Sequence, residues 1–274
     1  MAISIPLEDT TADIVGKAMR GLSRNATEVA RLAGISEAEV VALRDGHFTA
    51  GAARAVAPVL GLGGEALVLL GEGQWRPQPV QVEGLACFNT PFHDMTVNSY
   101  LAFDRKAGTA VAFDTGADCS EMLAFLKAEG LTLELILITH SHADHVLDLA
   151  RLRQATGAEA YTSRLEPADG AVPFEAGHSF TSGGLKISSR STWGHSKGGV
   201  SYLVEGLQPP TAVVGDAVFA GSMGGGSVSY ADALRTNREE LLSLPGETVL
   251  CPGHGPLTTV AEERLHNPFF ALDR

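Results

Sequence analysis

Four side chains of types that commonly bind metal ions stand close together in mid-chain: His140, His142, Asp144 and His145. They follow the apolar run 133–138, which predicts a strand, and precede Val146–Ala155, which we expect to be helical. Side chains two residues apart in an extended segment point the same way, so the first two histidines face one position. The aspartate and the last histidine lie in the turn that follows and can face a second position nearby. The spacing therefore predicts two adjacent cations.

Three further candidates come later in the chain, where strands are expected to end. They are His195, Asp216 and His254, and a glycine directly precedes each of them, which permits a sharp turn of the backbone. The complete set is five imidazoles and two carboxylates. Zinc and similar divalent metals take these donors, and two such ions can share one carboxylate and one water. The residue types therefore predict a binuclear centre.

The composition is that of an ordinary globular protein, with 45% hydrophobic and 19% charged residues among 274. The net charge of -12 disfavours nucleic-acid binding, because phosphate backbones call for a basic surface. Three scattered cysteines predict no disulfide framework and indicate a reducing compartment. Residues 1–10 lack the apolar core of a signal peptide, and no run of 18 uncharged apolar residues occurs. We expect a cytoplasmic protein with no membrane span.

Residues 1–74 differ from the rest and predict a small all-helical module. The expected helices are 13–23, 27–33, 37–44, 50–60 and 65–70, with Ser36 and Glu39 as a capping box before the third. The segment 28–46 resembles the helix-turn-helix of phage repressors. Its candidate recognition helix nevertheless carries Glu37, Glu39 and Asp45 against Arg44 alone, and an acidic surface repels phosphate. We therefore predict a packing or dimerisation module, which allows a homodimer, and disfavour a DNA-binding regulator.

Residues 75–274 are expected to form the second domain, after a proline-containing linker at 74–79. Clusters of strands with helices between them predict an α/β (α+β) fold in which two sheets pack together and helices lie outside. The expected strands are 80–88, 97–103, 109–113, 133–138, 158–162, 178–181, 185–189, 200–204, 211–214 and 248–251. The expected helices are 118–129, 146–155, 230–244 and 260–265.

The order and spacing of the metal motifs resemble those of the metallo-beta-lactamase-fold hydrolase superfamily, over about residues 80–274. The resemblance implies a four-layer αββα sandwich with the site at one edge of the two sheets. It implies that His140, His142 and His195 hold the first metal. It also implies that Asp144, His145 and His254 hold the second, and that Asp216 bridges the two.

Within the superfamily, the chain is similar to glyoxalase II-type thioesterases. The similarity rests on the segments Gly215–Gly225 and Gly253–Thr259, followed by Asn267-Pro268-Phe269. Larger glyoxalase II enzymes continue into a C-terminal domain that grips glutathione, whereas this chain stops at Arg274 and resembles the short form.

The resemblance implies a binuclear hydrolase in which a metal-bridging hydroxide attacks the acyl carbon of a small-molecule thioester. Asp144 is expected to orient the water, and Asp216 is expected to act beside it. Zinc is the favoured metal, with iron or manganese as alternatives. We expect substrate contacts from two bordering loops, one holding His93 and the other the glycine-rich segment 221–226 with Gly224.

Two other enzymatic activities compete with thioester hydrolysis. Lactonases and other ester hydrolases use the same ligand set. Persulfide dioxygenases share the histidine motif but use a single iron, and they have a His-Asp-Tyr sequence at the last motif. Here that place is occupied by His254-Gly255-Pro256, which favours hydrolysis.

Overall fold

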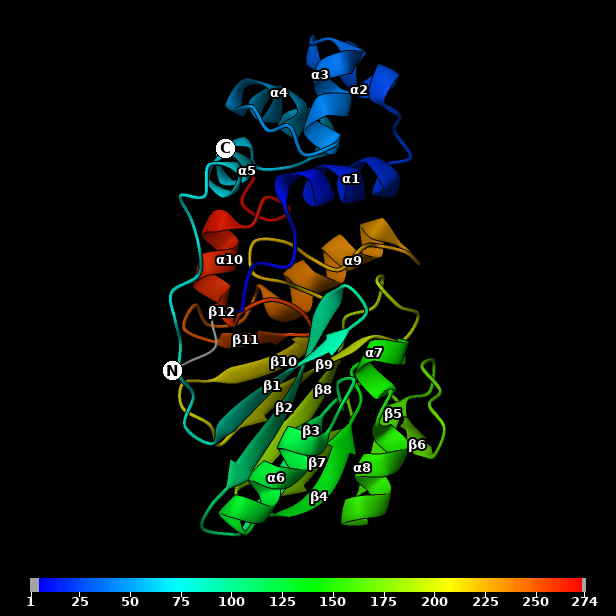
Figure 1. Cartoon of the computed structure of the whole chain (residues 1–274), viewed down its shortest axis with the longest axis vertical. Coiled ribbons are helices and arrows are strands. Elements are labelled where there is room, and N and C mark those ends of the chain that lie inside the picture. The colour runs from blue at the N-terminus through cyan, green and yellow to red at the C-terminus, as the bar shows by residue number, and fades with distance from the viewer. Residues whose placement is uncertain (1–4, 273–274) are drawn as a thin grey trace.

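Two six-stranded sheets form the body of the protein in a computed structural model that describes residues 5–272 (Figure 1). The first sheet has the order β1-β2-β3-β4-β5-β6 and the second the order β12-β11-β10-β9-β8-β7. The strands of the first sheet are β1 (Leu85–Phe92), β2 (Met95–Asp104), β3 (Thr109–Phe113), β4 (Thr132–Leu137), β5 (Glu159–Ser163) and β6 (Ala171–Phe174). Those of the second are β7 (Ser179–Ser182), β8 (Leu185–Ser191), β9 (Val200–Glu205), β10 (Thr211–Gly215), β11 (Val249–Pro252) and β12 (Thr258–Thr259).

The sheets pack face to face and helices cover their outer faces. Tyr100, Phe113 and Tyr202 lie in the buried layer between the sheets. Apolar side chains of α6 (Ser120–Glu129) and α8 (Leu149–Thr156) pack on the outside of the first sheet. A π-helical turn, η1 (Asn237–Leu241), and α10 (Val260–His266) cover the second, next to α9 (Tyr230–Thr236). This arrangement confirms the predicted αββα layering.

Strand direction explains why the candidate residues meet. β3 and β4 are parallel, as are β10 and β11. β8 is antiparallel to β9, which is antiparallel to β10, so β8 runs in the direction of β10. The segments after β4, β8, β10 and β11 therefore leave the sheets at one edge, and they carry all the predicted ligands. Asp144 and His145 lie in the single turn α7 (Ala143–Val146) that follows β4.

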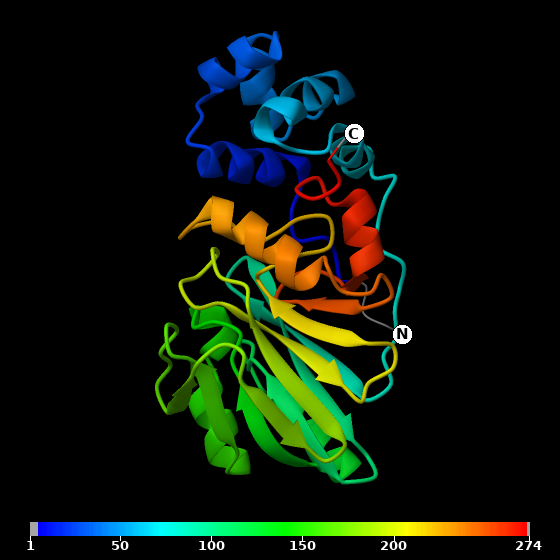
Figure 2. The same ribbon diagram turned by 180° about the vertical axis from the view of Figure 1, so that it is seen from behind.

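Five helices precede the sheets, as predicted: α1 (Thr11–Gly21), α2 (Ala26–Ala33), α3 (Glu37–Arg44), α4 (Ala50–Leu60) and α5 (Gly64–Gly71). Ser36 and Glu39 form the expected capping box at α3. The helices stack on one end of the sandwich, and α1 faces α9 in both views (Figures 1 and 2). Their core also includes Met223, Tyr230 and Phe269. The boundary at 74/75 stays a prediction, as do the homodimer and the absence of a nucleic-acid partner.

Several boundaries differ from the predicted ones. The first strand begins at Leu85 rather than residue 80, because Gly84 adopts a left-handed conformation just before it. That strand continues through Pro91, which an edge strand tolerates. The helix expected over 146–155 breaks at Asp148, whose carboxylate accepts a hydrogen bond from Cys119 N. The helix expected over 230–244 changes to π geometry at Asn237, and the short strands β6 and β12 were missed. Within residues 5–272, no helix is long and apolar enough to cross a membrane.

Candidate metal centre

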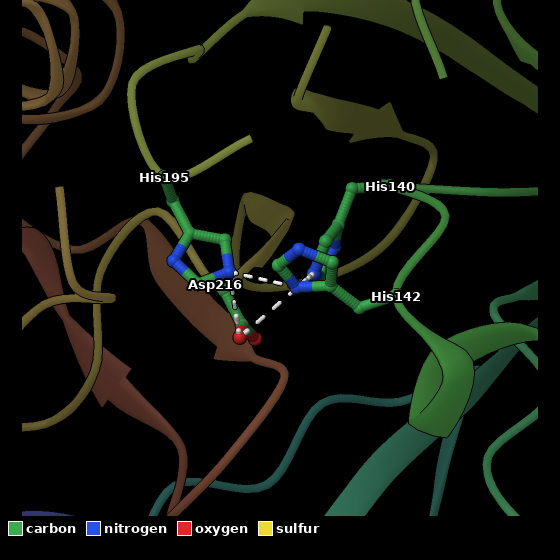
Figure 3. Close-up of side chains that lie close together, drawn as sticks. All are labelled: His140, His142, His195 and Asp216. Carbon is green, nitrogen blue, oxygen red and sulfur yellow. Dashed lines mark hydrogen bonds and ion pairs between the residues drawn. The ribbon is translucent and has the colours of Figure 1, made fainter. Parts of the chain in front are cut away.

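The first group of donors contains His140, His142, His195 and Asp216, whose ligand atoms lie within 4.8 Å of one another. Figure 3 shows these side chains converging on a common point. His142 Nδ1 lies 3.0 Å from His140 Nε2 and 3.1 Å from His195 Nε2. Asp216 Oδ2 lies 3.4 Å from His195 Nε2 and 3.9 Å from His140 Nε2. The structure thus brings four of the seven predicted residues into one cluster.

The second group contains Asp144, His145 and His254. Asp144 Oδ2 lies 3.2 Å from His254 Nε2 and 3.6 Å from His145 Nε2. Asp216 also reaches this group, since its Oδ1 lies 3.3 Å from His145 Nε2 and its Oδ2 lies 3.5 Å from His254 Nε2. The Asp216 carboxylate therefore contacts both groups, which is the position of a bridging ligand.

Hydrogen bonds at Nδ1 orient the imidazoles and leave Nε2 directed into the centre. His254 Nδ1 lies 2.7 Å from the carbonyl oxygen of Thr96, and His195 Nδ1 lies 2.9 Å from that of Gly225. A carbonyl oxygen can only accept, so each Nδ1 carries a proton and Nε2 is the nitrogen that can bind a metal ion once it has no proton of its own. His145 Nδ1 is held in the same way by a carboxylate, that of Asp114, at 2.7 Å. His142 differs, since it presents Nδ1 to the centre.

Asp114 was missed in the sequence analysis, although it organises the second group. It lies directly after β3 with a φ of 57°, a left-handed conformation that aspartate tolerates better than most residues. Its Oδ1 accepts a hydrogen bond from Thr139 N at 2.7 Å, and its Oδ2 accepts one from Thr139 Oγ1 at 2.7 Å. A signal existed: Asp114 ends a strand that is parallel to the strand before His140, so both residues belong at the same edge.

Charge and burial set the protonation of the metal-free centre. Burial favours neutral imidazole at His145, but the carboxylates of Asp114 and Asp216 overcome it and raise the pKa of His145 to about 10. Burial is likewise outweighed at His254, where Asp216 and Asp144 raise the pKa to about 11. Burial lowers the pKa of His140 and that of His195. At Asp216, burial is outweighed by His145 and His254, so its pKa lies well below the ordinary value.

The donor set suits divalent metal ions. In the first group, His142 Nδ1 lies 3.0 Å from His140 Nε2 and 3.1 Å from His195 Nε2, and one proton on His142 Nδ1 can satisfy only one of these neighbours, whereas a cation binds all three nitrogens. In the second group, the buried atoms His145 Nε2 and Asp216 Oδ1 lie 3.3 Å apart without a well-formed hydrogen bond, and without metal the proton on the imidazole offsets the carboxylate charge, so a metal ion can take the place of that proton. Ligand atoms around a tetrahedral zinc with bonds of about 2.0–2.1 Å lie about 3.4 Å apart. The separations above bracket that value.

The surrounding loops are tied together by Glu166, which the sequence analysis also missed. Its carboxylate accepts hydrogen bonds from Ser141 N at 3.1 Å and Ser141 Oγ at 2.7 Å, and from Gly198 N at 2.9 Å. It therefore connects the loop of His140 and His142 to the loop of His195.

The two predicted substrate contacts lie in different settings. His93 is exposed at the tip of the β1–β2 hairpin, the same hairpin whose Thr96 carbonyl holds His254. Gly224 is buried, and its N donates to Asp216 O at 3.1 Å. A Cβ on Gly224 would lie 2.0 Å from Asp216 O and 2.8 Å from His195 Nδ1, which explains the need for glycine. Substrate contact by either residue stays a prediction.

Comparisons with known proteins agree with this geometry. The family model of the metallo-beta-lactamase superfamily matches residues 94–254. A probable metallo-hydrolase of Bacillus subtilis, YqgX, is 30% identical over 207 residues, which are 65% of this chain and 94% of the relative. A hydroxyacylglutathione hydrolase of Dechloromonas aromatica is 30% identical over 57% of this chain and 58% of its own length. The human mitochondrial persulfide dioxygenase ETHE1 is 30% identical over 64% of this chain and 71% of its own length.

Solved structures extend the similarity to the fold. The ETHE1 protein of Myxococcus xanthus superposes with a TM-score of 0.61 at 26% identity, over 68% of this chain and 84% of that chain. The protein TTHA1623 in a di-iron-bound form superposes with a TM-score of 0.56 at 27% identity, over 66% of this chain and 99% of that chain. Each of these two structures leaves about a third of this chain uncovered.

Proposed function

The chain belongs to the metallo-beta-lactamase superfamily, and on this premise we propose that it is a binuclear metal-dependent hydrolase of thioesters. One observation carries the proposal: seven donor side chains stand in two groups, and Asp216 contacts both. The similarity to a protein solved in a di-iron-bound form supports the same view.

In this proposal His140, His142 and His195 hold the first ion. Asp144, His145 and His254 hold the second, and Asp216 bridges them. Two divalent ions bound there would lower the pKa of a shared water toward about 7, well below that of bulk water, and would polarise the acyl carbonyl. Zinc is our preferred assignment, and iron or manganese can take the same donors.

The protein's own residues orient the reactants. Burial disfavours the charge on Asp144, but its hydrogen bond with His254 outweighs this and keeps the pKa of Asp144 below the ordinary value. Asp144 is therefore a carboxylate at neutral pH, and it can accept a hydrogen bond from the attacking water. Its side chain is 12% exposed, against 0% for His145 and 4% for His254, so it is the most accessible donor of the second group.

A thioester suits this site because a thiolate leaves with little help from an acid. The pKa of a free cysteine thiol is about 8.5, several units below that of an alcohol. The neighbouring carboxylates of Asp114 and Glu166 are engaged by Thr139, Ser141 and Gly198, so neither is free to protonate a leaving group. The similarity to a hydroxyacylglutathione hydrolase supports this choice, while lactones and other esters are alternative substrates.

Persulfide dioxygenation by a single iron is the second candidate. The human relative is named a persulfide dioxygenase, ETHE1, and the Myxococcus xanthus protein that superposes on this chain is also named ETHE1. We rank it lower because His254 is followed by Gly255-Pro256 and not by the Asp-Tyr of the dioxygenase motif.

The test is a substrate panel with the metal-loaded protein: lactoylglutathione, acyl-coenzyme A thioesters, lactones, and glutathione persulfide with oxygen. We expect thioester hydrolysis that is lost in His145→Ala and in Asp216→Ala. It should be retained in His178→Ala, which removes an exposed histidine packed between Phe174 and Phe180. Oxygen consumption without thioester hydrolysis would contradict the proposal, as would full activity in either ligand variant.

A further inference from the structure

The N-terminal helices are packed onto the metal-site half of the molecule. Ile14, Ala18 and Met19 of α1 share one apolar core with Met223, Tyr230 and Ala233. A Cβ on Gly21 would lie 2.2 Å from the ring of Tyr230, so the two surfaces are in direct contact. Figure 2 shows α1 lying alongside α9.

The loop 219–226 lies between α1 and the metal centre. Its residues Phe219–Gly224 are buried. On the inner side, Gly224 N donates to Asp216 O at 3.1 Å, and Gly225 O accepts the hydrogen bond from His195 Nδ1 at 2.9 Å. The position of this loop therefore fixes the orientation of one predicted metal ligand, His195.

A buried ion pair from the helical region contacts the outer side of the loop and forms hydrogen bonds with it. Lys17 Nζ donates to the carbonyl oxygen of Met223 at 2.9 Å and pairs with the carboxylate of Asp9. The same carboxylate accepts a hydrogen bond from Ser222 Oγ. The side chains of Lys17 and Asp9 are only 14% and 8% exposed. The Lys17 ammonium also lies 5.1 Å from the ring centre of Phe219, whose edge packs against His254 at 5.6 Å.

We propose that the N-terminal helical region is part of the metal centre, with Lys17 as a positioning residue that acts through Met223 and Gly225 on His195. Packing alone would not call for this pair, because taking two charges out of water costs several kcal/mol per ion before their attraction is counted. The hydrogen bond from Lys17 to one backbone carbonyl fixes the loop at one position. Apolar packing alone would allow the loop to shift along the surface of α1. One residue, Gly224, separates the carbonyl that Lys17 holds from the one that holds His195.

The inference depends on metal binding at this centre and not on the identity of the substrate. It is therefore tested by binding and spectroscopy on the full-length protein. Lys17→Met removes the ammonium and keeps an apolar stem, Lys17→Arg restores a donor, and Asp9→Asn weakens the pair without changing its shape. Arg24→Met is the matched control, because Arg24 Nη1 also donates to a backbone carbonyl, that of Val59, within the helical region and away from the loop.

We expect Lys17→Met to weaken zinc affinity about tenfold, at the lower end of the 10–100-fold range for residues that orient ligands. The visible spectrum of the cobalt(II)-substituted protein should shift with it, because the His195 ring moves. Lys17→Arg should recover most of the affinity, Asp9→Asn should show a smaller loss, and Arg24→Met should leave affinity and spectrum unchanged.

The proposal is overturned if Lys17→Met and Asp9→Asn lower only the melting temperature while zinc affinity and the cobalt spectrum stay as in the wild type. If Lys17→Met does not fold, the milder Asp9→Asn and Lys17→Arg variants decide by the same two measurements. A wild-type protein that binds zinc but hydrolyses no thioester would refute the proposed function and leave this inference standing.

Discussion

Replacing Asp114 by asparagine should weaken metal binding although it changes none of the seven predicted ligands. The carboxylate accepts three hydrogen bonds at 2.7 Å, two from Thr139 and one from His145 Nδ1. Asparagine is nearly isosteric and tolerates the left-handed φ of 57°. It carries no charge, however, and its NH₂ group must face Thr139 N or His145 Nδ1. One buried donor is therefore left unpaired, which costs about 1–3 kcal/mol of folding stability.

The loss in metal affinity can be estimated separately. A partner that orients a ligating histidine contributes about 10–100-fold in affinity, or about 1.4–2.7 kcal/mol. The pH dependence has a definite sign. In the wild type His145, with a pKa of about 10, must lose a proton before it binds metal. Without Asp114 this proton leaves more easily, which offsets part of the loss at low pH. The deficit of Asp114→Asn should therefore grow as pH rises toward 10.

Zinc affinity, measured by competition with a chromophoric chelator between pH 6.5 and 9, tests both statements. Asp148→Asn is the control, because Asp148, between α7 and α8, is also a carboxylate that accepts a hydrogen bond from a backbone N–H, that of Cys119, at 2.8 Å. Equal affinity in Asp114→Asn and wild type at pH 9 would refute the reasoning. So would a deficit that shrinks as pH rises, or an equal loss in the Asp148→Asn control.

Three further predictions address other parts of the molecule. Metal loading of the apo-protein at pH 8 should release about three protons per chain: two come from His145 and His254, whose pKa values without metal are about 10 and 11, and about one comes from the shared water, whose pKa two bound ions would lower toward about 7. Calorimetry in two buffers of different ionisation enthalpy measures this release, and its absence would contradict the assigned protonation. Gly224→Ala should abolish metal binding or folding, whereas Gly225→Ala, whose Cβ would meet nothing closer than Ser227 Oγ at 3.8 Å, should bind metal normally; equal metal content in both would be a contrary result. Burial raises the pKa of Glu263 to about 7, above its ordinary 4.5, so its contribution to stability is full below about pH 4.5 and is lost as pH rises through 7. Glu263→Gln, which stays neutral at every pH and keeps a side-chain carbonyl oxygen to accept from Thr258 Oγ1, should gain about 3 kcal/mol on the wild type between pH 4.5 and 8 in denaturant titrations, and a constant difference would count against this assignment.

The sequence contained enough information to predict the layers and to name seven side chains that converge in the structure; metal binding by these side chains stays a prediction. Alternating and apolar runs mark most strands, and each predicted ligand follows such a run, so strand direction alone brings them to one edge. The motif spacing then separates two groups: His140 and His142 lie in an extended segment and face one position, whereas Asp144 and His145 lie in the following turn and face another.

What could not be predicted depends on contacts between distant segments. Asp114 and Glu166 look like ordinary acidic residues until β3 lies next to β4 and the loop of His195 lies near Ser141. The start of the first strand depends on the left-handed Gly84, which sequence periodicity does not reveal. The link from Lys17 to Met223 joins residues 206 positions apart, so no local pattern could indicate it.

The central claim is that two metal ions act together in this centre. Its most direct test is to titrate the metal-free protein with zinc, iron(II) or manganese(II) while following thioester hydrolysis and the metal content per chain. The account predicts activity that rises to a plateau at about two ions per chain and is lost in both His140→Ala and His254→Ala. A plateau at one iron per chain, with oxygen consumed and His254→Ala fully active, would contradict it.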